Sequence, residues 1–174
     1  MSKNETSNEL ARTRVSPTAE PTATLGLLVV HPSVAYEAYS QRLRGLIGKA
    51  VEISVSADFE AEEEVSTSLL PEWFQDLSDT PSRSGANSYA EVGKGDPWDK
   101  EEWIYCFDSD LRAWIWWDLT RFPGGAAVWI DTQGEGHIPH EELVWALYVA
   151  GASLVEPLRT EAASAWKASS DLEQ

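Results

Sequence analysis

The stretch EEWIYCFDSDLRAWIWWDLTRFPGGAAVWIDT, residues 101–132, decides the fold of this chain. Its three apolar runs, at 103–107, 111–119 and 126–131, are separated by two turn signals and hold five of the chain's nine tryptophans. Trp, Ile, Tyr, Phe and Val suit a pleated strand, whereas Asp-Ser-Asp at 108–110 and TRFPGG at 120–125 suit turns. The pattern therefore predicts an antiparallel β-meander.

Side chains alternate between the two faces of a strand, which divides the middle run into two chemically different sets. One set is mainly aliphatic and consists of Leu111, Ala113, Ile115, Trp117 and Leu119. The other set is aromatic and charged and consists of Arg112, Trp114, Trp116 and Asp118. If residue 119 faces residue 126, Val128 and Ile130 join the aliphatic face, and Trp129 and Asp131 join the aromatic one. A first turn of two or four residues places the 103–107 run on the aromatic face, and a three-residue turn places it on the other. We prefer the former, because it makes both faces uniform.

The aromatic face has two interpretations. Large aromatic side chains are mostly buried, which favours a sheet covered on both faces. The charges of Arg112, Asp118 and Asp131 favour partial exposure instead, since charges are rarely buried unpaired. An exposed face would be a platform for a protein or a sugar. A covered one would lie under the helix expected at 34–47, or under a second copy of the chain in a homodimer.

The flanking sequence predicts the rest of the fold. Helical spacing of apolar residues indicates helices at 34–47, at 70–77 and from Pro139 to Gly151. The last is apolar nearly all round, so we expect it to pack on the aliphatic face of the sheet. Residues 25–30 indicate a strand or the lead-in to a helix, and the alternation at 50–56 indicates a half-exposed strand. Weaker patterns indicate a loop at 79–87, strands at 88–92 and 153–155, and a helix at 160–167.

These elements predict an α+β fold, with an antiparallel sheet of about four to six strands and two main helices. We expect one such domain at residues 25–168. Residues 1–24 are polar and without periodicity, which predicts a disordered segment, and residues 169–174 are expected to fray.

The charge of the chain narrows its partners. It contains 29 Asp and Glu against 13 Lys and Arg, for a net charge of −16. This charge argues against binding a nucleic-acid backbone or an anionic membrane surface, and favours encounter with a basic protein. There is no secretory signal, and the longest apolar run, 143–155, is too short for a membrane span, so we expect a cytoplasmic protein.

The segment ADFEAEEE, residues 57–64, is the most acidic part of the chain. Its carboxylates at Asp58, Glu60, Glu62 and Glu64 recur at period two and would line one side of a continuing strand. Unpaired carboxylates in this geometry suit a cation or a partner rich in Lys and Arg, although a solvated acidic loop explains the same composition. The Asp/Asn–Gly pattern of an EF-hand is absent, so no dedicated calcium site is expected.

No catalytic motif is present. His137 and His140, with Glu141 beside them, are the best metal candidate, but a proline between them leaves their directions unfixed and HExxH is absent. G-x-S-x-G is also absent. Cys106 lies in a predicted strand, where an inert buried thiol is expected. Carboxylates beside tryptophans match a glycosidase, as any acidic Trp-rich sheet would. We therefore expect no enzyme activity, no cofactor and no metal.

The sequence favours a non-enzymatic module that binds and occludes a basic protein, such as an inhibitor or an immunity protein against a toxin. Interface anchors are often tryptophans, and acidic groups steer a basic partner. The expected contact residues are Glu60, Glu62, Glu64, Trp114, Trp116 and Asp118. Two alternatives remain: an acidic chaperone or adaptor for a secreted client, and a glycan-binding or glycan-active protein that uses the tryptophan face.

Overall fold

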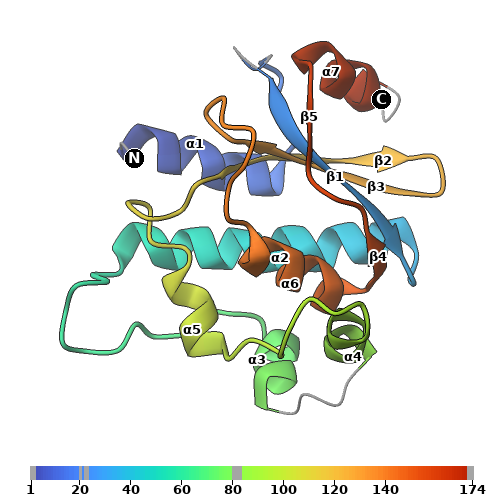
Figure 1. Cartoon of the computed structure of the whole chain (residues 1–174). Coiled ribbons are helices and arrows are strands. Elements are labelled where there is room, and N and C mark those ends of the chain that lie inside the picture. Colours follow the sequence, from blue (N-terminus) through green and yellow to red (C-terminus); the bar gives the residue numbers. More distant parts are fainter. Residues whose placement is uncertain (1–2, 20, 22–23, 80–83, 172–174) are drawn as a thin grey trace.

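The computed structural model describes residues 3–19, 21, 24–79 and 84–171 as helices, strands and connecting segments. In chain order the elements are α1 (Lys3–Arg14), β1 (Leu25–Pro32), α2 (Tyr36–Ser56), α3 (Glu72–Asp79), α4 (Ser84–Glu91), α5 (Lys100–Tyr105), β2 (Ile115–Phe122), β3 (Gly125–Asp131), α6 (Glu141–Ala150), β4 (Ala152–Val155), β5 (Arg159–Glu161) and α7 (Ala163–Asp171) (Figure 1). The predicted α+β class is confirmed.

All strand pairs are antiparallel, in the order β2-β3-β1-β4, with β5 also paired to β1. The predicted sheet of about four to six strands is thus confirmed, and so is the strand at 25–30.

The hairpin between β2 and β3 places Phe122 opposite Gly125. Gly124 in its turn has a φ of 80°, a conformation that favours glycine. A Cβ on Gly125 would lie 2.3 Å from the Val30 carbonyl oxygen, so only glycine allows the hairpin to approach β1 this closely.

A bulge in β2 changes which residues share a face. Trp116 pairs with Ile130 and Asp118 with Trp129, so one extra residue, Trp117, is inserted between two paired positions. Trp116 consequently joins Val128 in the large core beneath the sheet, and Trp117 packs with Trp129 above it. The predicted separation into an aliphatic and an aromatic face was wrong, because one inserted residue inverts every side chain that precedes it.

Helix α2 continues through the predicted strand at 50–56. Ala50 and Ile53 extend the buried stripe that begins at Tyr39 and Leu43, so the helical period is unbroken. Gly48, which directly follows the predicted helix at 34–47, lies inside α2. A Cβ at this position would be 2.9 Å from Thr13 Oγ1, so the glycine makes room for α1.

The run at 103–107 is the end of α5 followed by a turn at 106–107, and not the predicted first strand. Asp99 begins α5 by accepting hydrogen bonds from the backbone N–H groups of Glu101 and Glu102. Trp103 and Phe107 are four residues apart, a spacing that brings side chains together on a helix, and their ring centroids are 4.6 Å apart. The chain enters the sheet only at Ile115, and β1 takes the place of the third meander strand.

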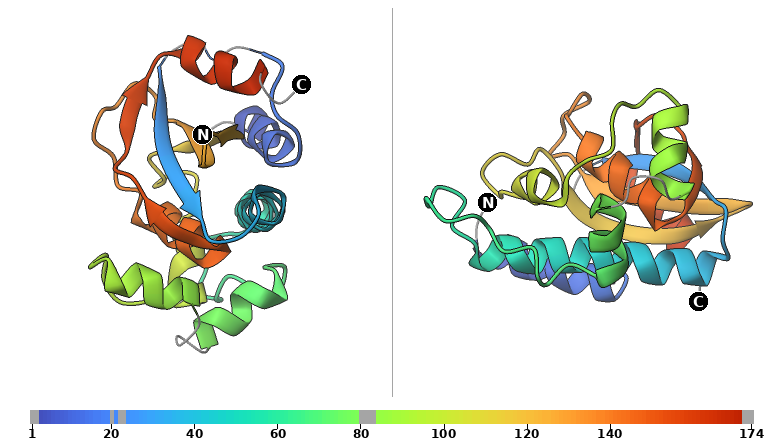
Figure 2. Two further views of the ribbon diagram at one scale, coloured as in Figure 1. Left: turned by 90° about the vertical axis from the view of Figure 1, so that its right-hand side faces the viewer. Right: turned by 90° about the horizontal axis from the view of Figure 1, so that it is seen from below.

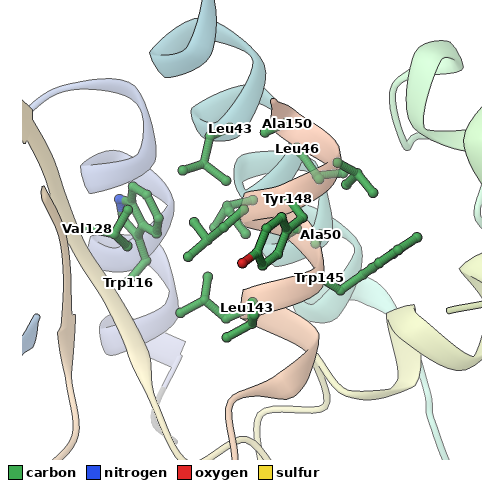
Figure 3. Close-up of a cluster of buried hydrophobic side chains, with 14 of the residues drawn as sticks. Leu43, Leu46, Ala50, Trp116, Val128, Leu143, Trp145, Tyr148 and Ala150 are labelled. Carbon is green, nitrogen blue, oxygen red and sulfur yellow. The ribbon is translucent and has the colours of Figure 1, made fainter. Parts of the chain in front are cut away.

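The main core lies between the sheet and the helices α2 and α6 (Figure 3). Trp116 and Val128 point into it from the sheet, Leu43 and Leu46 from α2, and Leu143 from α6. Every residue of α6 from Glu142 to Ala150 is buried, as expected for a central helix packed on the sheet. The smaller core on the other face is closed by Trp166 of α7. Figure 2 shows these layers from two further directions.

Residues 3–14 of the segment predicted to be disordered form α1, which packs along α2 and the edge strand β2 (Figure 2), and residues 1–2, 20 and 22–23 lie outside the described residues. The carboxylate of Glu9 is buried and accepts hydrogen bonds from Arg112 Nη2 at 2.6 Å and from the backbone nitrogen of Trp116 at 2.7 Å. Arg12 Nε donates to the Trp116 carbonyl at 2.9 Å. Polar side chains of α1 thus satisfy backbone groups that an edge strand leaves open.

The remaining predictions had mixed outcomes. The helix at 70–77 and the strand at 153–155 are confirmed as α3 and β4. The loop at 79–87 and the strand at 88–92 were wrong where α4 replaces them, and residues 80–83 lie outside the described residues. The helix at 160–167 begins later, at Ala163, after the unpredicted β5. Fraying from 169 was also wrong for the end of α7, where Ser170 is buried, and residues 172–174 lie outside the described residues.

Candidate functional site

The tryptophans expected to bind a partner belong to the core. Trp114 and Trp116 have no exposed surface. Trp114 Nε1 donates a hydrogen bond of 2.5 Å to Oε1 of Glu142, and burial raises the pKa of that carboxyl above its ordinary value. These side chains bind α6 and the sheet to each other, and they present no platform to a protein or a sugar.

Asp118 is also buried, and it joins four segments of the chain. Its Oδ1 accepts hydrogen bonds from Arg44 Nη2 at 2.8 Å and from Ser16 Oγ at 2.9 Å, and its Oδ2 accepts one from Trp166 Nε1 at 2.9 Å. A buried carboxylate needs partners of this kind to offset its desolvation. The assignment of Asp118 to a partner-binding surface was therefore wrong, and its role is structural.

The acidic segment at 57–64 is exposed, in contrast to the tryptophans. It leaves the C-terminal end of α2 as a series of turns and bends. The carboxylates would have lined one side only if a strand continued through 57–64, so they do not line up in this way. The predicted residues Glu60, Glu62 and Glu64 are all exposed. Asp58 Oδ1 accepts a hydrogen bond of 3.1 Å from the backbone nitrogen of Glu60, which fixes the first turn.

A second acidic turn, at 108–110, lies beside this segment at the same end of α2 (Figure 1). Asp108 Oδ1 accepts a 3.0 Å hydrogen bond from the backbone nitrogen of Asp110, so this turn is built like the first one. The two turns line a hollow of about 530 Å³ that contains Asp58, Glu60, Asp108 and Asp110. The fold thus brings together carboxylates that are about 50 residues apart in the sequence.

A second hollow, of about 350 Å³, shares Ala57 and Asp58 with the first and also contains Glu63 and Glu64. We call the six carboxylates of these two hollows the acidic face: Asp58, Glu60, Glu63, Glu64, Asp108 and Asp110. None of the described residues that line either hollow is a lysine or an arginine. Glu62 lies on the same segment but lines neither hollow. The described lining of the acidic face therefore contains acidic side chains and no basic ones.

Apolar side chains are exposed within the acidic face. Leu111 lines the first hollow and is 77% exposed, the highest value among the large apolar side chains for which exposure is described. Phe59 lines the same hollow and packs edge-on against Tyr105, with 5.6 Å between ring centroids. Leu69 is exposed in the second hollow. Exposed apolar groups ringed by charge are typical of protein interaction sites.

Sequence reasoning found only half of this face. The composition of 57–64 marked Glu60 and Glu64, but the 108–110 turn was assigned to a hairpin far from them. The signal that could have placed it is the spacing of four between Trp103 and Phe107, which favours a helical turn over a strand at this run.

The other candidate groups offer little chemistry. His137 Nδ1 and His140 Nδ1 each lie 2.8 Å from a nearby backbone carbonyl oxygen. Across the residues that the structure describes, no three His, Cys, Asp or Glu side chains are grouped so that they could hold a metal ion. Cys106 is half-buried at the end of α5, not inside a strand, and burial, together with the negative charge of Glu142, raises the pKa of its thiol to about 11.

Comparison of the chain with protein-family models, with curated proteins and with solved structures finds no match. Among the described helices, none combines the length and the apolar character that crossing a membrane requires.

Proposed function

We propose that this chain is a non-enzymatic protein-binding module that docks a basic protein on its acidic face and occludes it. The observation that carries the proposal is that two acidic turns, one after α2 and one after α5, meet around the exposed Leu111. The finer identity that we propose is an inhibitor or immunity-type protein in the cytoplasm.

The two kinds of side chain would have different roles in binding. Full burial of a leucine side chain such as Leu111 stabilises a complex by about 1.5–3 kcal/mol. Carboxylates at the rim of an interface mainly increase the association rate and fix the orientation of the partner. The proposed partner therefore presents Lys or Arg side chains around an apolar pocket.

Burial of the tryptophans removes the basis of the glycan alternative. Stacking on a sugar needs an accessible aromatic face, whereas Trp114, Trp116 and Trp129 are buried. The described lining of the acidic face combines carboxylates with the exposed Leu111 and Leu69 and contains a single aromatic ring, that of the partly buried Phe59, which suits a protein better than a sugar.

A pull-down from the cell of origin with three versions of the chain tests the proposal. The acidic-face variant carries Glu60→Gln, Glu64→Gln and Asp110→Asn. The matched control carries Glu91→Gln, Asp96→Asn and Glu135→Gln, which change the same charge at exposed positions outside the face.

The expected result is a basic protein retained by the unmodified chain and by the control, and lost by the acidic-face variant. Raising salt from about 0.1 M to about 1 M shortens the Debye length from about 10 Å to about 3 Å and should also release the partner. Retention of the same proteins by all three versions would show that the acidic face is not the binding site.

A further inference from the structure

The opposite half of α2 carries a cavity of the opposite charge. Its volume is about 470 Å³, and the residues that line it are Arg14, Ser16, Tyr36, Ser40, Arg44, Leu119 and Arg121. Ser40 and Ser54, which line the two sites, are 14 positions apart on α2, or about 21 Å at 1.5 Å per residue. The cavity is therefore separate from the acidic face. Figure 2 shows α1 and α2 side by side next to β2, the three elements that supply its arginines.

Three guanidinium groups line this cavity in a chain whose net charge is −16. Such a concentration is unexpected, because the chain has only 13 lysines and arginines. The three arginines come from the last turn of α1, the middle of α2 and the end of β2, so the tertiary fold brings them together.

Arg44 forms a fixed wall of the cavity. Its Nη2 donates to Asp118 Oδ1 at 2.8 Å and to the Leu119 carbonyl at 2.7 Å, and its Nη1 donates to the Arg12 carbonyl at 2.9 Å. Asp118 neutralises the charge of this guanidinium. Arg44 therefore shapes the wall of the cavity and adds little positive charge for a ligand.

The other two arginines are exposed, and they supply the positive charge once Arg121 turns away from Glu37. Arg14 is exposed at the end of α1. Arg121 lies over the ring of Tyr36, 4.4 Å from its centroid, and pairs with Glu37 in a contact where both side chains are more than half exposed. Exposed ion pairs of this kind are weak, so Arg121 can turn to an incoming anion at little cost. Ser40, four residues after Tyr36 and four before Arg44, adds a hydroxyl donor on the same side of α2.

We propose that this cavity binds a small molecule that carries a phosphate or diphosphate group. The planar guanidinium fork matches phosphate oxygens with two parallel hydrogen bonds, and phosphate is the group that arginine clusters recognise best. The volume lies within the range of roughly 300–1,000 Å³ usual for small-ligand sites. Arg14 and Arg121 contact the phosphate, and Tyr36 and Ser40 line the space beside it.

Isothermal titration with inorganic pyrophosphate at low ionic strength tests this site. The variants are Arg14→Gln and Arg121→Gln, and the matched control is Arg159→Gln, which removes the same charge from β5, outside the cavity. Both cavity arginines are exposed, so unchanged urea midpoints should show that the variants remain folded.

The expected result is saturable one-to-one binding by the unmodified chain and by the control, with an affinity at least tenfold lower in each cavity variant. Citrate is the second probe, because it carries similar charge on carboxylates, and we expect it to bind at least tenfold more weakly than pyrophosphate. Equal affinity for citrate, equal weakening in Arg159→Gln, or no saturable binding of pyrophosphate would each overturn the proposal.

Discussion

Replacement of Glu9 by alanine should be among the most destabilising single changes in the chain. The Glu9 carboxylate has no exposed surface and accepts hydrogen bonds from Arg112 and from the backbone of Trp116. Without it, Arg112 becomes a buried charge whose Nε and Nη1 already have no hydrogen-bond partner among the described residues. Removing one member of a buried ion pair costs about 3–5 kcal/mol, since the other charge is left uncompensated.

The loss should be visible in urea unfolding followed by tryptophan fluorescence. With a slope of about 2 kcal/mol per molar urea, a loss of about 4 kcal/mol lowers the midpoint by about 2 M. Asn8→Ala is the matched control, because Asn8 is exposed on the same helix and its replacement should change stability by less than about 0.5 kcal/mol.

A second substitution distinguishes the cost of the uncompensated Arg112 charge from the cost of losing the contact between α1 and β2. Arg112→Met in the Glu9→Ala background removes the uncompensated charge and should recover part of the lost stability. A Glu9→Ala midpoint as high as that of Asn8→Ala would refute the reasoning, because it would mean that α1 is not held to β2 through Glu9.

Two further measurements follow from the buried carboxyl of Glu142 and from the thiol of Cys106. Burial raises the pKa of Glu142, so its contribution to stability is complete below its ordinary value of 4.5 and is lost as pH rises through the higher folded value. Glu142→Gln should therefore be more stable than the unmodified chain at pH 7 and not at pH 4, and urea midpoints at the two pH values check this; an equal difference at both would contradict it. With a pKa of about 11 in place of 9.0, Cys106 should have roughly 100-fold less thiolate at pH 8. Alkylation by iodoacetamide, timed by mass spectrometry, should be correspondingly slow in the folded protein and fast in urea, and equal rates would show that the thiol is not shielded.

Elements whose signals are local were predictable from the sequence. The β2–β3 hairpin has a Pro-Gly turn between two β-rich runs, and α6 has an apolar stripe that ends at Gly151 with a φ of 125°. Helix α1 has no such stripe. It is held by hydrogen bonds such as that between Glu9 and Trp116, 107 positions apart, which no window of sequence contains.

The part of the candidate site that depends on local composition was predictable, and the part that depends on tertiary packing was not. The composition of 57–64 indicated exposure of Glu60 and Glu64 directly. Burial of Trp114 and Trp116 agreed with the interpretation of a sheet covered on both faces, whereas their place in the larger core with Val128 depended on the bulge at Trp117. The position of Asp108 and Asp110 beside the 57–64 segment depended on α5 being a helix. Register and tertiary proximity are set by packing across the fold, so residue types alone could not place these groups.

Site-specific photocrosslinking in the cell of origin tests the central proposal most directly. A photoreactive phenylalanine at position 111 would lie within the acidic face, and the same residue at Leu154 on β4, 48% exposed, is the control. The proposal predicts an adduct with a basic protein from position 111 that disappears in the acidic-face variant, and none from position 154. An adduct from position 154 alone, or one from position 111 that survives the acidic-face substitutions, would contradict a binding site built on the acidic face.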